Sequence, residues 1–153
     1  MTSRETLKKV AISRIDGARL LLNGGDWEGA SHMMALALEC ALKAAICKTL
    51  RVENYPEKYP SDKKVPDFFM THSFDRLLLL SGLLDIFSAS GNDQEWNNWS
   101  SFTIQFPGEW TAMRYDPAAA PNIFGEILTR QLMNSLYDDE KSVIKAISTR
   151  ERW

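Results

Sequence analysis

Apolar residues recur at helical spacing through most of the chain, and the longest such run occupies residues 26–50. In this run they cover nearly the whole helix circumference, which predicts a central rather than a peripheral helix. The run contains no proline and is rich in Ala, Leu and Met, which are strong helix formers. Asp26 follows two glycines and is placed to cap the amino end of the helix. We therefore expect the rest of the chain to pack around this segment.

Three polar residues interrupt the apolar surface of this central helix. At roughly 100° per residue, His32, Glu39 and Lys43 fall on one narrow stripe. The i,i+4 pair of Glu39 and Lys43 contributes only about 0.2–0.5 kcal/mol, which is too little to explain charges on a buried element. The stripe is therefore either a solvated seam or part of a site or an interface. If it is covered, a cation from elsewhere must pair with Glu39.

The flanking segments also carry helical patterns. Residues 4–23 have a one-sided apolar stripe, and the short turn at 23–26 predicts that this helix packs antiparallel to the central one. Further helices are expected at 72–87, 92–106 and from about 121 to 147. Together these patterns predict an all-α fold: an up-and-down four-helix bundle with one extra short helix, in a single domain spanning residues 1–153.

Helix starts and one long loop complete the predicted organisation. Ser73 can cap the third helix, and Asn92 with Glu95 has the spacing of a capping box for the next. Residues 51–71 contain three prolines and several aromatic residues, which predicts a long loop. Its aromatic part, residues 55–69, either packs on the bundle, covers a pocket or contacts a partner.

Composition restricts the functional classes. The net charge of -2 and the pI near 5.7 give no general electrostatic footprint for DNA or RNA, although a local patch is compatible with both. Cys40 and Cys47 lie roughly 10 Å apart along one helix, too far for a disulfide. Two cysteines and two histidines argue against a zinc site, and no catalytic triad, metal site or cofactor site is identifiable. The first residues lack the apolar run of a signal peptide, which predicts a cytoplasmic protein.

Arg114 is the cation that we single out, because Trp110, Met113 and Tyr115 surround it in the sequence. Two roles are open for it. It either forms an internal ion pair with Glu39 or Asp26, or it binds a phosphate or a partner. The second role is considered because a guanidinium can donate two parallel hydrogen bonds to phosphate oxygens.

Other polar candidates have simpler interpretations. His72 opens a predicted helix beside the long loop, and a local role near the helix cap is the simplest one. Asp138 and Asp139 are expected to be solvated on a helix exterior.

Four segments together resemble the HEPN domain family, named for nucleotide binding in higher eukaryotes and prokaryotes. They are ARLLLNGGDWEGA at 18–30, ALALECALKAAI at 35–46, HSFDRLLLL at 72–80 and WTAMRYDP at 110–117. The resemblance implies an all-α up-and-down bundle that often forms a homodimer. It also implies one of three activities: a metal-independent RNase, often a toxin or a phage-defence effector; a non-catalytic partner of a small nucleotidyltransferase; or a nucleotide-binding protein.

The RNases of that family carry an Arg followed four to six residues later by a His. Arg114 matches the Arg, but no His follows it, which argues against an enzyme. The resemblance thus implies a non-catalytic module that binds a nucleotide or a nucleotidyltransferase-type partner. Its expected ligand-binding residues are Arg114, Tyr115, Glu39, Lys43, Asp26 and His72.

Two alternatives remain at this point. One is a divergent RNase of a toxin–antitoxin or phage-defence system, in which His72 approaches Arg114. The other is a protein-interaction module that uses the aromatic loop at 55–69. RNA is a conceivable ligand under the first alternative; DNA and a membrane are not expected partners.

Overall fold

The computed structural model describes residues 2–57, 67–89, 91–106, 108, 110–111 and 124–153, and it is all-α across these ranges, with no strand among them. The helices are α1 (Arg4–Asn23), α2 (Trp27–Leu50), α3 (Phe74–Ser81), α4 (Leu84–Ser88), α5 (Asp93–Thr103), α6 (Glu126–Met133) and α7 (Val143–Thr149). A 3-10 turn at Asp67–Phe69 precedes α3, and a π-helical turn at Asn134–Asp138 extends α6.

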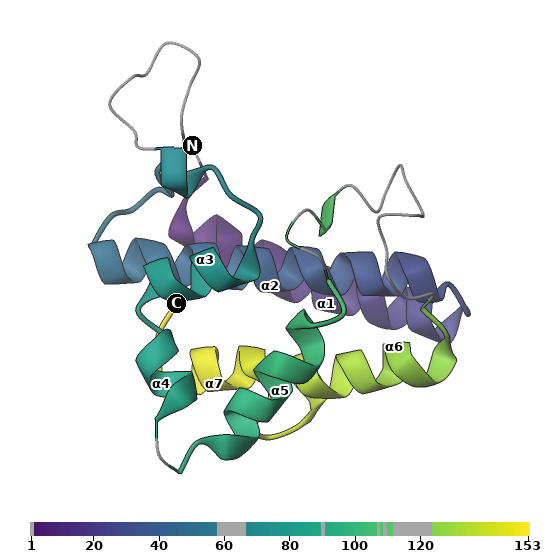
Figure 1. The fold of residues 1–153 in the computed structure, drawn as a ribbon. Helices are drawn as coiled ribbons and strands as arrows, with labels where there is room; N and C mark the ends of the chain where they lie inside the picture. Colours follow the sequence, from purple (N-terminus) through teal and green to yellow (C-terminus); the bar gives the residue numbers. More distant parts are fainter. Residues whose placement is uncertain (1, 58–66, 90, 107, 109, 112–123) are drawn as a thin grey trace.

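The first two helices form an antiparallel pair along the length of the molecule (Figure 1). The side chain of Ser3 caps α1 by accepting from the Thr6 N–H. Asp26 caps α2 by accepting from the Gly29 N–H at 2.9 Å, as the sequence predicts. The predicted α1 stripe is buried: Leu7, Ala11, Ile15, Ala18 and Leu22.

The second helix is central, as expected. It contacts α1, α3, α6 and α7, and most of its residues from Ala30 to Cys47 are buried. In Figure 1, α6 and α7 run in line along the pair formed by α1 and α2, α5 packs beside them, and α3 lies against α2.

Two of the predicted helices are broken. The helix expected at 72–87 ends at Ser81, because Gly82 adopts a left-handed conformation (φ 74°) and its N–H bonds to the Leu79 carbonyl. The last helix begins at Glu126 rather than near residue 121, and it is interrupted after Asp138. There Asp139 accepts from the Lys141 N–H, and Ser142 caps α7, so that side chains compete with the helical bonding pattern.

Asp138 is exposed and Asp139 is half-buried at the surface, as the sequence suggests, but both also bond to residues far away in the sequence. Asp138 accepts two hydrogen bonds from the Arg19 guanidinium, at 2.5 and 3.1 Å, and thereby joins the π-helical turn to α1. Asp139 accepts from the Gln94 amide at 3.0 Å, which joins the same turn to α5. The sequence did not indicate these bonds, because the partners are distant along the chain.

Cys40 and Cys47 are both free thiols, in agreement with their predicted separation. Within the ranges that the structure describes, no helix has the length and apolarity needed to cross a membrane.

Candidate functional site

The polar stripe on α2 is covered by the segment that leads into α3. The Glu39 carboxylate accepts from the Lys43 ammonium at 2.8 Å and lies 3.0 Å from Nδ1 of His72 through both of its oxygens. Its side chain is only 9% exposed. A cation therefore pairs with Glu39, as a covered stripe requires, but it comes from Lys43 of the same helix and, when protonated, from His72.

Local capping positions His72. The Ser73 hydroxyl caps α3 by accepting from the Arg76 N–H, and the Thr71 hydroxyl accepts from the Ser73 N–H at 3.1 Å. These bonds fix the backbone immediately before α3, so that the imidazole of His72 reaches across to α2. The predicted local role of His72 is thus incomplete, since its ring bonds to a residue 33 positions away.

Trp110 closes one side of the site. It is fully buried, and its indole N–H donates to the His72 carbonyl at 2.9 Å. Its ring contacts that of His32 at 5.3 Å and stacks on Phe74 at 5.8 Å. The segment that carries Arg114 and Tyr115 in the sequence therefore begins at the polar stripe. Arg114 and Tyr115 themselves lie outside the described residues.

Tyr55 closes the other side. It is 1% exposed, its hydroxyl donates to the Phe69 carbonyl at 2.8 Å, and the Lys43 ammonium lies 5.0 Å from the centre of its ring. Burial, and then the negative charge of Glu39, raise the pKa of Tyr55 well above its ordinary value. We call Glu39, Lys43, Tyr55, His72 and Trp110 the Glu39 cluster.

The described ends of the long loop pack onto the bundle through Tyr55 and Phe69, both of which are buried. Phe68 is half-exposed, at 51%. Residues 58–66 lie outside the described ranges, so a partner role for the aromatic loop remains a prediction.

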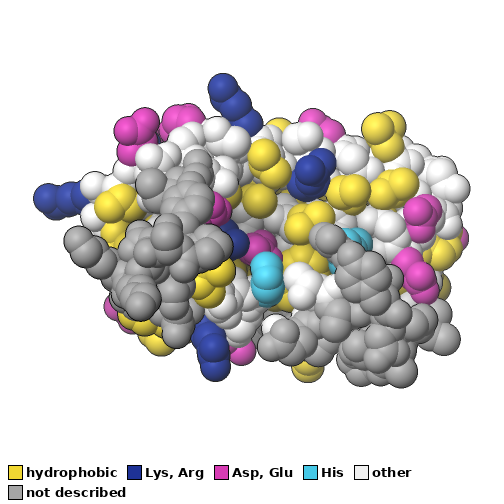
Figure 2. All heavy atoms as spheres, turned by 90° about the horizontal axis from the view of Figure 1, so that it is seen from above, with side chains coloured by type: hydrophobic (Ala, Val, Ile, Leu, Met, Phe, Trp, Pro, Cys, Tyr) yellow, Lys and Arg dark blue, Asp and Glu magenta, His cyan; other side chains and the backbone are white. Residues whose placement is uncertain are grey.

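The hydrogen bonding of the cluster sets the orientation of the imidazole. A carboxylate that pairs with Lys43 is ionised and only accepts, so in a neutral His72 the Nδ1 atom carries the proton and donates it to Glu39. This leaves Nε2 as an acceptor. The His72 side chain is 51% exposed. On the face drawn in Figure 2, histidine side chains lie at the surface together with acidic and basic ones. The arrangement can accept a proton or a hydrogen bond from a ligand.

The remaining candidates do not all join the cluster. Asp26 caps α2 thirteen residues before Glu39, about 20 Å away along the helix axis. Its partner there is the Gly29 N–H, so its carboxylate contributes to the helix start. His32 is half-buried, and its ring contacts that of Trp110. Cys40, which follows Glu39, has its pKa raised by burial and by the Glu39 charge, so its thiol is a poor nucleophile.

Sequence reasoning missed the roles of Tyr55, Trp110 and Glu95. The predicted capping box of α5 is wrong, because the Asn92 side chain donates to the Ile86 carbonyl and makes no cap bond. Glu95 is instead 3% exposed and lies 3.7 Å from Lys141 and 3.6 Å from Arg150. Its sequence signal was its spacing, four residues before Trp99 and seven before Phe102, which places it on the buried face of the helix.

Neither the comparison with protein-family models nor those with curated proteins and solved structures finds a match for this chain. Among the residues that the structure describes, no group of three or more His, Cys, Asp or Glu side chains is arranged to hold a metal ion.

Proposed function

We propose that this chain is a HEPN-like binding module without catalytic activity, and that it binds a nucleotide or a nucleotidyltransferase-type partner. The site consists of the Glu39 cluster together with Arg114 and Tyr115. The finer arrangement that belongs to this proposal is an up-and-down bundle of four main helices, which works as a homodimer in the cytoplasm.

The bond from the Trp110 indole to the His72 carbonyl carries the proposal. Trp110 opens the segment WTAMRYDP, and His72 opens the segment HSFDRLLLL, while Glu39 and Lys43 lie in the central segment. Three of the four segments on which the resemblance rests thus meet within one cluster. A single binding site accounts for polar side chains from distant parts of the chain on an otherwise apolar central helix.

The charges within the cluster assign the roles. Lys43 already pairs with Glu39 at 2.8 Å, so it is a weak candidate for a phosphate. Arg114 is the cation proposed for that contact, because a guanidinium forms paired hydrogen bonds to phosphate oxygens. His72 is proposed to bond to the sugar or the base through Nε2.

Thermal unfolding in the presence of ATP, GTP, AMP and a short RNA tests this proposal. A ligand at about 100 times its Kd adds roughly 2.7 kcal/mol, and about 1 kcal/mol raises the Tm of a chain of this size by roughly 2–4 °C. We expect a rise for at least one ligand in the wild type. The rise should vanish in Arg114→Ala and persist in Arg152→Ala, which removes an equal charge from the exposed C-terminal tail.

Two outcomes contradict the proposal. If Arg114→Ala retains the full rise in Tm, the site assignment is wrong. If none of the ligands raises the Tm, the nucleotide is excluded, and the partner protein becomes the ligand to be tested.

A divergent RNase is the second candidate, and the Glu39–His72 pair is the observation that favours it. The sequence lacks a His after Arg114, but the pair supplies an imidazole that a carboxylate orients through Nδ1. In such a reaction Nε2 accepts the proton of an RNA 2'-hydroxyl, whose oxygen attacks the phosphorus, and the 5'-oxygen leaves with a proton from solvent.

Growth of cells that overexpress the chain, together with cleavage of total RNA by the purified protein, tests this candidate. His72→Asn is the informative variant, because the amide can still donate to Glu39 but offers no basic nitrogen. Growth arrest and cleavage that disappear in His72→Asn support an RNase. If the wild type neither arrests growth nor cleaves RNA, this candidate is wrong.

A further inference from the structure

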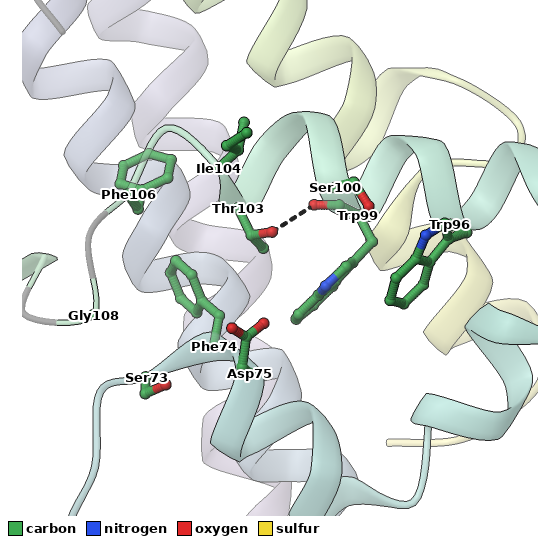
Figure 3. A pocket seen from close by; sticks show the side chains of 10 residues that line it. All are labelled: Ser73, Phe74, Asp75, Trp96, Trp99, Ser100, Thr103, Ile104, Phe106 and Gly108. Carbon is green, nitrogen blue, oxygen red and sulfur yellow. Dashed lines mark hydrogen bonds between the residues drawn. The ribbon is translucent and has the colours of Figure 1, made fainter. Parts of the chain in front are cut away.

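A groove lies between the start of α3 and α5, on the far side of Phe74 from the Glu39 cluster. Its volume is about 420 Å³. The described residues that line it are Ser73, Phe74, Asp75, Trp96, Trp99, Ser100, Thr103, Ile104, Phe106 and Gly108. We call it the α3–α5 groove. Four of these residues are aromatic, and Trp96 is the exposed one among them. Figure 3 shows the Asp75 carboxylate pointing into the groove between the rings of Phe74 and Trp99.

The described lining of the groove carries a single charge, which is negative. Asp75 is the only charged side chain among the described lining residues, and no ion pair is formed by it within the described ranges. The neighbouring acid on α5, Glu95, differs in this respect because Lys141 and Arg150 already balance it. A carboxylate beside aromatic rings is complementary to a cation, since the ring faces also attract positive charge.

We propose that the α3–α5 groove binds an arginine side chain of a partner polypeptide. A planar guanidinium can stack on an indole and bond to a carboxylate through two N–H groups, which an ammonium cannot do. Trp96 and Ile104 at the rim are 39% and 75% exposed. Their apolar surface suits the aliphatic stem of the arginine and its chain neighbours, and a small free cation would leave it uncovered. The single negative charge disfavours RNA, whose phosphates Asp75 repels.

This inference does not depend on the proposed nucleotide site. Phe74 separates the two regions, because it lines the groove and stacks on Trp110 of the Glu39 cluster. A variant at Asp75 can therefore be tested without altering any residue of the proposed nucleotide site.

Titration of the protein with an arginine-containing peptide, followed by NMR of the Trp indole N–H groups, tests the inference. The peptide is acetyl-Ala-Leu-Arg-Leu-Ala-amide, and the reference peptide carries citrulline, the neutral isostere, in place of Arg. We expect a saturable shift of the Trp96 indole signal with the Arg peptide, and an affinity at least about tenfold weaker with citrulline, since a charge-assisted hydrogen bond is lost.

Asp75→Asn is expected to weaken binding of the Arg peptide by at least about tenfold. Asp85→Asn is the matched control, because Asp85 is also an exposed acid in the first turn of a helix, α4, but does not line the groove. It should bind as the wild type does. The inference is overturned if the citrulline peptide binds equally well, if Asp75→Asn binds like Asp85→Asn, or if an RNA oligonucleotide rather than the peptide shifts the Trp96 signal.

Discussion

Two glutamates are buried among the residues that the structure describes, and each lies near two basic groups, yet the two regions differ in geometry. Glu39 bonds to Lys43 at 2.8 Å and to His72 at 3.0 Å. Glu95 lies 3.7 Å from Lys141 and 3.6 Å from Arg150. The first set of distances is that of hydrogen-bonded pairs, whereas the second is that of looser ion pairs.

The basic partners differ as well. The side chains of Lys141 and Arg150 can only donate hydrogen bonds, and they hold α5 against the C-terminal part of the chain. His72 instead presents an imidazole, whose second ring nitrogen can accept a hydrogen bond, and its side chain is 51% exposed. Burial of a carboxylate therefore does not by itself indicate a site. The Glu39 cluster is distinguished by hydrogen bonds to a half-exposed, titratable partner. The Glu95 region, in contrast, is a structural link between helices.

The largest expected effect is a difference in the free energy of unfolding between alanine variants of the two glutamates. Glu39→Ala leaves the Lys43 ammonium without its partner, although that side chain is only 17% exposed, so we expect a loss of about 3–5 kcal/mol in the free energy of unfolding. Glu95→Ala should cost less, about 1–3 kcal/mol, because the side chains of Lys141 and Arg150 are 55% and 34% exposed and can be hydrated.

Urea unfolding of both variants at pH 7 measures this difference. Glu126→Ala serves as the control, because its pair with Arg130 is on the surface and should contribute no more than about 1 kcal/mol. Equal losses for Glu39→Ala and Glu95→Ala would show that the two regions play the same structural part.

A smaller effect is expected where Trp110 supports His72. Trp110→Phe removes the indole N–H and leaves the His72 carbonyl without that donor, which should lower the free energy of unfolding by about 1–3 kcal/mol. Trp96→Phe is the matched substitution, since Trp96 is 39% exposed, and it should change the free energy by no more than about 0.5 kcal/mol. A Trp110→Phe protein as stable as Trp96→Phe would mean that Trp110 does not hold this segment.

Tyr55 makes the cluster sensitive to alkaline pH. Its pKa is raised in the folded state above the ordinary 10.0, so above pH 10 the unfolded chain releases the proton first. The contribution of Tyr55 is complete below that pH and falls by up to about 1.4 kcal/mol per pH unit above it. Tyr55→Phe should be about 0.5–1.5 kcal/mol less stable than the wild type at pH 7, because the bond to the Phe69 carbonyl is lost.

The difference between the wild type and Tyr55→Phe should therefore narrow as the pH rises from 10 to 11, and urea unfolding at several pH values measures it. Tyr137→Phe leaves Tyr55 in place and should retain the slope of the wild type. A difference that stays constant with pH would contradict the raised pKa.

The smallest effect is expected at the partners of Glu95. Lys141→Gln removes a 55% exposed ammonium that lies 3.7 Å from the carboxylate, and Arg150 remains as a partner. The expected loss is between 0 and about 1 kcal/mol, and it should decrease in high salt. A loss above about 2 kcal/mol, measured by urea unfolding, would show that the Glu95 region is as tightly coupled as a buried pair.

Local patterns predicted the helices that depend on local signals. The bounds of α1 and α2 and the caps at Asp26 and Ser73 follow from spacing and from side chains that bond within three residues. The break at Gly82 was missed because leucines on both sides continue the apolar pattern across it. The break before Ser142 depends on Asp139, whose side chain bonds both to the nearby Lys141 N–H and to the distant Gln94.

The candidate site was predicted less completely than the helices. The stripe of Glu39 and Lys43 is visible at helical spacing, but the pairing of Glu39 with His72 spans 33 residues, and the bond from Trp110 to His72 spans 38. No periodicity encodes contacts of that separation. They depend on how α3 docks on α2, which is a property of the packed chain.

The three-residue connection between α1 and α2 also has a consequence for the order of events in folding. The two longest helices are neighbours in sequence, and their buried faces meet with a short loop to close. Closing a short loop costs little entropy, and contacts between sequence neighbours form fastest. We therefore expect this hairpin to assemble before α3, α5 and α7 dock on it. Substitutions such as Ile15→Val should then slow refolding. Substitutions that shorten the Ile147 side chain should mainly speed unfolding.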